Sequence, residues 1–141
     1  MATTTATISL SSGDIADNSF SISNTSTLYT AGTNTGITET TGLGRKKVAS
    51  ASNIVLLDGG LTSGVAADVT ADKSAKVYIK NHNDRGDGTK FVNILLAAVE
   101  LGRLYGGAWM FIPWCAASGK DIEFTASDAT ETTLEYTCFY E

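Results

Sequence analysis

The sequence predicts an all-β protein, namely an antiparallel β-sandwich or jelly roll with an extended polar N-terminal arm. Apolar and polar residues alternate at period two in many short segments, as they do in strands. Turn-forming residues recur roughly every 8 to 12 residues, the spacing typical of sandwiches and jelly rolls. The chain has 141 residues, enough for one domain, and its hydrophobic fraction of 43% argues against a disordered chain.

Residues 1–44 are expected to form the arm. This stretch contains no Lys or Arg and is dominated by Thr, Ser, Asn and Gly. Short alternations predict weak strands within it, at Ile8 and Leu10, at Phe20 and Ile22, and at Leu28. Thr30 to Gly44 is expected to be a loop. Because so few apolar side chains can offset the loss of chain entropy, we expect the arm to order only partly on its own.

Residues 45–141 are expected to form the compact sandwich. Strands are predicted at Asn53–Leu57, Lys76–Asn81, Phe91–Val99, Leu101–Tyr105, Ala108–Ile112, Asp121–Ala126 and Thr133–Glu141. The segment Phe91–Val99 is apolar on both faces and could also be a helix. Its β-branched and aromatic residues favour a covered central strand.

Gly106 and Gly107 separate two apolar alternations and predict a β-hairpin turn. Pro113 is expected to end the second strand of that hairpin, because proline cannot donate to a ladder. Period-two placement predicts a core that includes Val77, Ile79, Ile94, Trp109, Phe111, Phe124 and Tyr136. It also places Leu134, Tyr136, Cys138 and Tyr140 on one face of the last strand.

The residues offer no plausible catalytic or metal site, so we expect neither enzyme activity nor a cofactor. His82 is the only histidine, and it lies in a polar turn where a solvated side chain is the simpler interpretation. Cys115 and Cys138 cannot bind a metal alone. They are expected to be small buried residues, with a disulfide as the alternative.

Three other patterns are better explained as ordinary surface. Asn83 to Gly88 is similar to a calcium loop, but Arg85 stands where a ligand is needed and no glutamate closes the loop. Arg85-Gly86-Asp87 spells an adhesion tripeptide that also occurs by chance. Asp121 and Glu123 could be spaced as paired carboxylates, yet they lie on a predicted solvent face.

Two groups are candidates for binding. Arg45, Lys46 and Lys47 form the one basic cluster, which is either a solvated charge run or an electrostatic contact to an acidic partner. Four aromatic residues could form a sugar-binding platform or belong to the core, namely Tyr105, Trp109, Trp114 and Tyr140.

The net charge of −5 argues against nucleic acid and anionic membranes as partners, since both require basic surface. The first five residues lack the basic start and apolar core of a signal peptide, and no run is long enough to span a bilayer. We therefore expect the protein to be made in a cytoplasm.

Several segments resemble small virion structural proteins of tailed bacteriophages, especially T4-like marine cyanophages. The resemblance rests on Ala2–Ile8, Thr41–Lys46, Lys76–Asn81, Leu101–Tyr105, Ala108–Trp114 and Leu134–Tyr136. Their order along the chain is more specific than any single segment, and the resemblance extends over nearly the whole chain, from the first of these segments to the last. The resemblance implies a virion component without enzyme activity, and it brings no catalytic residue with it.

Within the virion, the leading hypothesis is a capsid decoration or cement protein on the outer surface of the shell. An acidic protein would be repelled by packaged DNA, which argues against a position inside the shell. A small β-domain also has a suitable size to fill the space between larger subunits. The expected partners are the major capsid protein and other copies of the same chain, as a trimer if three-fold positions are used. The alternative is a tail, neck or fibre component, possibly with a glycan-binding aromatic face.

Overall fold

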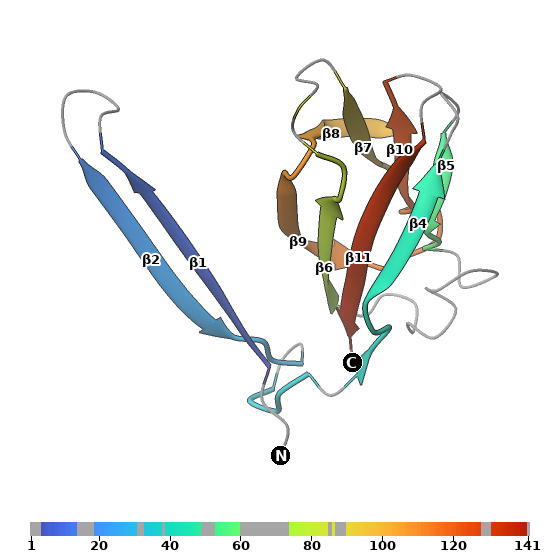
Figure 1. The fold of residues 1–141 in the computed structure, drawn as a ribbon. Coiled ribbons are helices and arrows are strands. Elements are labelled where there is room, and N and C mark those ends of the chain that lie inside the picture. The colour runs from blue at the N-terminus through green and yellow to red at the C-terminus, as the bar shows by residue number, and fades with distance from the viewer. Residues whose placement is uncertain are drawn as a thin grey trace. The chain divides into compact units, whose positions relative to one another are not determined.

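The computed structural model describes residues 4–13, 19–30, 33–37, 39–48, 53–59, 74–84, 86, 90–127 and 131–140, and these form strands and connecting turns only (Figure 1). The all-β class is therefore confirmed. The chain divides into two compact units, residues 1–38 and residues 39–141. Residues 39–44, assigned to the arm from sequence, belong to the second unit.

The strands of the first unit are β1 (Thr5–Ser12) and β2 (Phe20–Thr27). Those of the second unit are β3 (Glu39–Thr40), β4 (Gly44–Val48), β5 (Ile54–Leu57), β6 (Ser74–Asn81), β7 (Phe91–Leu96), β8 (Val99–Tyr105), β9 (Trp109–Cys115), β10 (Ile122–Ala126) and β11 (Thr132–Tyr140). The predicted loop from Thr30 to Gly44 thus contains β3 and the first residue of β4. It also contributes Gly36 to a bridge with Tyr29.

The second unit is an antiparallel β-sandwich. One sheet has the order β5-β10-β7-β8, and the other has the order β3-β11-β6-β9 with β4 also paired to β11 (Figure 1). Both sheets supply the core, as sandwich packing requires. Val77, Ile79 and Leu134 come from one sheet, Ile94 and Phe124 come from the other, and all five are fully buried.

The Gly106–Gly107 segment is a corner between the two sheets, so the predicted hairpin is wrong. β8 pairs with β7, whereas β9 pairs with β6. The Ala108 N–H donates to Tyr105 O at 2.8 Å, and Gly107 has φ = 77°. This is the pattern of a type II turn, whose twist splays strands instead of pairing them. A Cβ on Gly106 would lie 2.4 Å from Asp84 O, so the corner also requires glycine there.

Asn81 holds this corner in place. Its buried side chain donates from Nδ2 to Leu104 O at 3.0 Å, which links β6 of one sheet to β8 of the other. Its Oδ1 accepts from the Asn83 N–H at 3.1 Å. Its backbone exchanges hydrogen bonds with Gly107 and Ala108, at 2.9 and 3.0 Å. A buried amide satisfied on both sides rigidifies the junction.

The predicted strand Phe91–Val99 is two strands joined by a tight turn. β7 ends at Leu96, β8 starts at Val99, and these two residues are paired. Ala97 and Ala98 form the two-residue loop with φ values of 51° and 63°. Positive φ at both positions is the type I′ geometry, which Asn and Gly normally adopt. Alanine carries no turn signal, which explains why the sequence did not predict this turn.

β9 continues through Pro113 to Cys115, so the expectation that proline ends this strand is wrong. β9 lies at the edge of its sheet. Proline is tolerated there because one side of the strand has no ladder partner. Cys115 is exposed, contrary to expectation, while Cys138 is buried, and neither forms a disulfide.

The inward face of β9 is the opposite of the one predicted. Trp109 is 50% exposed and Phe111 is only half-buried, so neither belongs to the core as expected. Trp114 is buried instead, and Met110 and Ile112 pack against the core from the same face. Both faces of this strand are apolar, and a period of two cannot tell which face lies inward. The other five residues of the predicted core are buried.

Candidate partner-binding face

The outer face of the sheet β3-β4-β11-β6-β9 collects basic and aromatic side chains. Along β6, Ala75, Val77 and Ile79 are buried in the core, so the intervening side chains lie on the outer face. Pairing across the sheet places their neighbours on the same face. The members, defined here as the outer face, are Thr40, Arg45, Lys47, Lys76, Tyr78, Lys80, Trp109, Phe111, Pro113, Thr133, Glu135, Thr137 and Phe139.

One row of side chains crosses the whole face. Arg45 on β4 is opposite Glu135 on β11, which is opposite Lys80 on β6, which is opposite Trp109 on β9. Directly opposed side chains in antiparallel sheets lie about 5 Å apart. The row therefore places alternating charges next to an exposed aromatic ring.

The basic residues exceed the acidic ones on this face. Arg45 binds Glu135 through Nε at 3.0 Å and Nη2 at 2.9 Å. Lys47 forms an ion pair with Glu131. Lys76 and Lys80 form no ion pair with any described residue. The outer face thus has four basic side chains against one acidic member, Glu135, with Glu131 just before β11 as a second acid beside it, although the chain as a whole carries a charge of −5.

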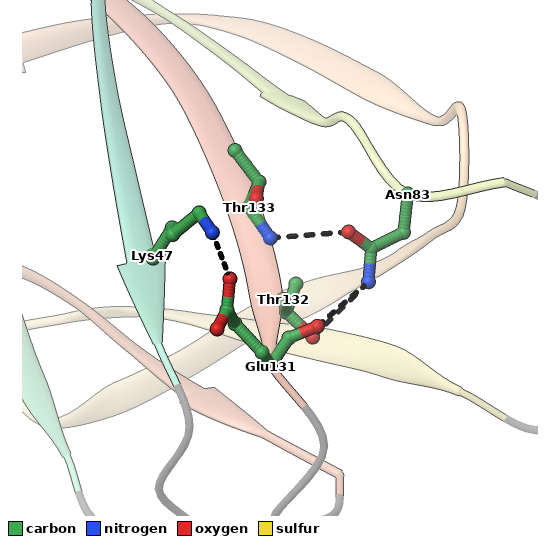
Figure 2. A network of polar contacts seen from close by, with 5 residues as sticks. All are labelled: Lys47, Asn83, Glu131, Thr132 and Thr133. Carbon is green, nitrogen blue, oxygen red and sulfur yellow. Dashed lines mark hydrogen bonds and ion pairs between the residues drawn. The ribbon is translucent and has the colours of Figure 1, made fainter.

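Figure 2 shows how residues at the start of β11 hold the ion pair between Lys47 and Glu131 in place. Asn83 Oδ1 accepts from the Thr133 N–H at 3.1 Å, and Asn83 Nδ2 donates to Thr132 Oγ1 at 3.4 Å. Glu131 immediately precedes Thr132 and Thr133 in the chain, and its carboxylate forms the ion pair with Lys47 on β4. Lys47 nevertheless keeps 71% of its side chain exposed. Such exposed pairs contribute little stability, so the charge stays available to a partner.

Lys46 separates from the other two members of the predicted basic cluster. It is paired with the buried Leu134, so it lies on the inner side of β4. Its Nζ donates to Val55 O on β5 of the other sheet at 2.8 Å. An inward-pointing charge of this kind protects an edge strand from pairing with other chains. Arg45 and Lys47 therefore share a face, whereas Lys46 bridges the two sheets.

The aromatic part of the outer face was only partly predicted. The rings of Tyr78 and Trp109 have centroids 6.4 Å apart, and Phe111 is opposite Tyr78 across the strands. Burial, with Glu135 as a second cause, raises the pKa of Tyr78, so its hydroxyl stays protonated and able to donate. The outward position of Lys76, Tyr78 and Lys80 follows from the predicted burial of Val77 and Ile79, which the structure confirms, whereas the outward position of Trp109 and Phe111 was not predicted.

The four aromatic residues predicted as a sugar platform are not brought together. Trp114 and Tyr140 lie in the core, and Trp114 Nε1 donates to Lys120 O at 2.7 Å. Tyr105 lies on β8 of the other sheet, where its ring is 5.5 Å from that of Phe91. Of the four, only Trp109 belongs to the outer face.

The remaining candidates have structural contacts or lie outside the described residues. His82 is exposed, and its N–H donates to Thr133 O at 2.8 Å. Asp121 Oδ1 accepts from the Gly59 N–H at 2.8 Å, whereas Glu123 Oε2 is buried without a hydrogen-bond partner among the described residues. Arg85 and Asp87 of the adhesion tripeptide and the calcium-like loop lie outside the described residues.

Within the described part of the chain, no group of three or more His, Cys, Asp or Glu side chains could hold a metal ion. The same residues include no helix that is long and apolar enough to cross a membrane. Comparison of the chain with protein-family models, with curated proteins and with solved structures gives no match.

Proposed function

We propose that this chain is a non-catalytic structural protein of a tailed-phage virion, and that it decorates the outer surface of the capsid. In this proposal it is made in the host cytoplasm, assembles as a homo-oligomer (a trimer at three-fold positions), and binds the major capsid protein. By binding the assembled shell and not the separated subunits, it would stabilise the shell.

The observation that carries the proposal is the basic and aromatic outer face on an otherwise acidic protein. Such a face is complementary to an acidic surface patch of a larger protein, while the acidic remainder is repelled by DNA. Trp, Tyr and Arg, each of which is present on this face, are also the residue types that most often dominate binding energy at interfaces. Four of the segments that resemble phage virion proteins overlap β4, β6, β9 and β11, which are strands of this one sheet.

The charge-reversal variant Arg45→Glu with Lys47→Glu tests the shell contact. Occupancy on purified particles is expected to fall by at least about tenfold, and wild-type occupancy is expected to decrease as salt rises. The matched control is Lys90→Glu with Lys120→Glu, which changes net charge equally next to the other sheet. The control should bind as the wild type does.

Equal occupancy of both variants would remove the outer face from the mechanism. Copy number tests the location: hundreds of copies per particle are expected for a decoration protein, and a handful would favour the tail, neck or fibre alternative. In that alternative, Trp109 and Tyr78 would be the residues to test for glycan binding, since stacking on sugars uses exposed rings.

A further inference from the structure

The ribbon formed by β1 and β2 has two chemically distinct faces. Its register runs without interruption through eight pairs, from Thr5 opposite Thr27 to Ser12 opposite Phe20. One face, the hydroxyl face, consists only of Thr and Ser: Thr5, Thr7, Ser9, Ser11, Ser21, Ser23, Thr25 and Thr27. The other, the apolar face, carries Ala6, Ile8, Leu10, Phe20 and Ile22, together with Ser12, Asn24 and Ser26.

The large side chains of the apolar face are open to solvent. Exposure is 38% for Ile8, 49% for Leu10, 42% for Phe20 and 55% for Ile22. Leu10 and Ile22 are directly opposite each other, so the four side chains form one contiguous cluster. Isolated two-stranded ribbons are marginal in water, and stable sheets have at least three strands or a covered apolar face. An exposed apolar cluster of this kind is typical of a surface that becomes covered on association.

The ribbon also lacks the features that keep exposed strands from associating. Natural edge strands are protected by charged side chains, proline or bulges. Neither β1 nor β2 contains a charged residue or a proline, and their pairing contains no bulge. The second unit differs, because its β4 edge carries Arg45, Lys46 and Lys47, and its β8 strand is bulged against β7.

Charge distribution favours another copy of this chain as the occupant. Residues 1–38 contain two acidic residues, Asp14 and Asp17, and no basic ones, so residues 39–141 carry 10 positive and 13 negative charges, a net of −3. Two copies, each with a net charge of −5, therefore repel each other overall, and the strands of the ribbon provide uncharged surface along which they can approach. A charged partner would find nothing to pair with, whereas an identical apolar face buries no unpaired charge.

We propose that the apolar face of the β1–β2 ribbon is the surface through which copies of this chain assemble, with the apolar faces turned toward one another and the hydroxyl faces toward water. Two ribbons packed in this way form a small four-stranded sandwich in which both apolar faces are covered. The inference rests on the homo-oligomer part of the proposed function and makes no use of the shell contact.

The test compares two double variants of the full-length protein by sedimentation velocity over a hundredfold range of concentration. Leu10→Thr with Ile22→Thr removes the centre of the apolar face and places at both positions a β-branched residue, which favours strands. Ser9→Thr with Ser23→Thr changes the directly opposed pair on the hydroxyl face and is the matched control. We expect the wild type and the control to be oligomeric, and the apolar-face variant to have a dissociation constant raised at least about tenfold.

Tryptophan fluorescence shows whether the second unit remains folded, because both tryptophans, Trp109 and Trp114, lie outside the ribbon. Hydrogen exchange of the wild type gives an independent readout, and protection of β1 and β2 is expected to rise with protein concentration. A wild type that stays monomeric would overturn the proposal. So would protection independent of concentration, which would mean that the ribbon is covered by its own chain.

An oligomer that the Leu10→Thr, Ile22→Thr variant leaves intact would place the interface elsewhere and would also overturn the proposal. Because these measurements use purified protein without particles, their failure is separate from a failure of the shell contact. Loss of particle binding in the Arg45→Glu, Lys47→Glu variant would likewise leave the self-association result unchanged.

Discussion

Trp109 and Trp114 lie on the same strand but on opposite faces of one sheet. Trp114 fills the core and donates its indole N–H, whereas Trp109 stands beside Tyr78 on the outer face. Tryptophan is suited to both positions, because it has a large apolar body and one polar group. Its presence in a strand therefore indicates that the residue is important to a contact, without indicating which contact.

The same distinction predicts unequal effects of truncating two phenylalanines. Phe124 is completely buried between the sheets, so Phe124→Ala should lower the free energy of unfolding by about 3 to 5 kcal/mol. Phe111→Ala should lower it by about 1 kcal/mol, because the outer face leaves no closed cavity. Urea denaturation followed by tryptophan fluorescence measures both. Equal losses would show that the outer face is covered.

Cys138 links stability to alkaline pH. It is fully buried, and desolvation raises the pKa of its thiol from 9.0 to about 12. The unfolded chain therefore ionises this thiol first, so its contribution is complete below pH 9 and is lost as pH rises toward the folded pKa. We expect the free energy of unfolding to fall by about 1.4 kcal/mol for each pH unit above 9 from this group.

The Cys138→Ala variant should lack this part of the pH dependence. Comparison of its urea midpoints with those of the wild type between about pH 8 and about pH 11, a range that starts below the unfolded pKa and stays below the folded one, isolates it. Cys115 is exposed and serves as an internal control for reactivity. A thiol reagent at neutral pH should modify Cys115 in the native protein and Cys138 only after unfolding. Fast modification of both thiols would contradict the buried position of Cys138.

At the scale of the element, two tight connections of the second unit reach positive φ with different residues. The Ala97–Ala98 loop returns the chain within one sheet, while the Gly106–Gly107 corner passes it to the other sheet. The first has positive φ at two alanines, which costs about 1 kcal/mol or more per residue. The second avoids this cost by using glycine and is supported by Asn81.

Replacing the alanines tests this account. Ala97→Asn with Ala98→Gly matches the residue preference of a type I′ turn and should raise the free energy of unfolding by about 1 kcal/mol. The control is Ala126→Gly, in the buried strand β10, which should lower it by a similar amount. Thermal and urea denaturation measure both variants. A destabilised Ala97→Asn, Ala98→Gly protein would show that the turn is not of this type.

At the scale of the whole molecule, each of the two units carries one of the two proposed binding surfaces. Residues 39–141 contain the sandwich and the outer face that we propose to bind the shell. Residues 1–38 contain the uncharged ribbon that we propose to bind other copies. Because the two binding surfaces are separate, an assembled oligomer can contact a shell through several copies at once. Its overall affinity for the shell then exceeds that of a single copy.

Deletion of residues 1–38 should therefore leave the sandwich folded. We expect the melting temperature of residues 39–141 to lie within about 5 °C of that of the full chain, measured by near-ultraviolet circular dichroism in dilute solution. The shortened protein should no longer self-associate. Its collapse to an unfolded chain would mean that the ribbon completes the core of the second unit.

The sequence by itself determined the all-β class, most strand positions and five of the seven predicted core residues, because alternation with a period of two is a local property of the chain. It also identified Arg45, Lys47 and Trp109 as candidates, since their residue types are unusual in their surroundings. These features need no knowledge of which strands are neighbours.

Only the tertiary structure decided which face of β9 lies inward, that Gly106 and Gly107 connect two sheets, and that Lys46 separates from Arg45 and Lys47. Each of these depends on strand pairing between segments far apart in the chain. A shift of one residue in register would reverse every face, and local composition does not specify register where both faces are apolar. The outer face exists because β4, β11, β6 and β9 pair in that order, and that order comes from packing of the core as a whole.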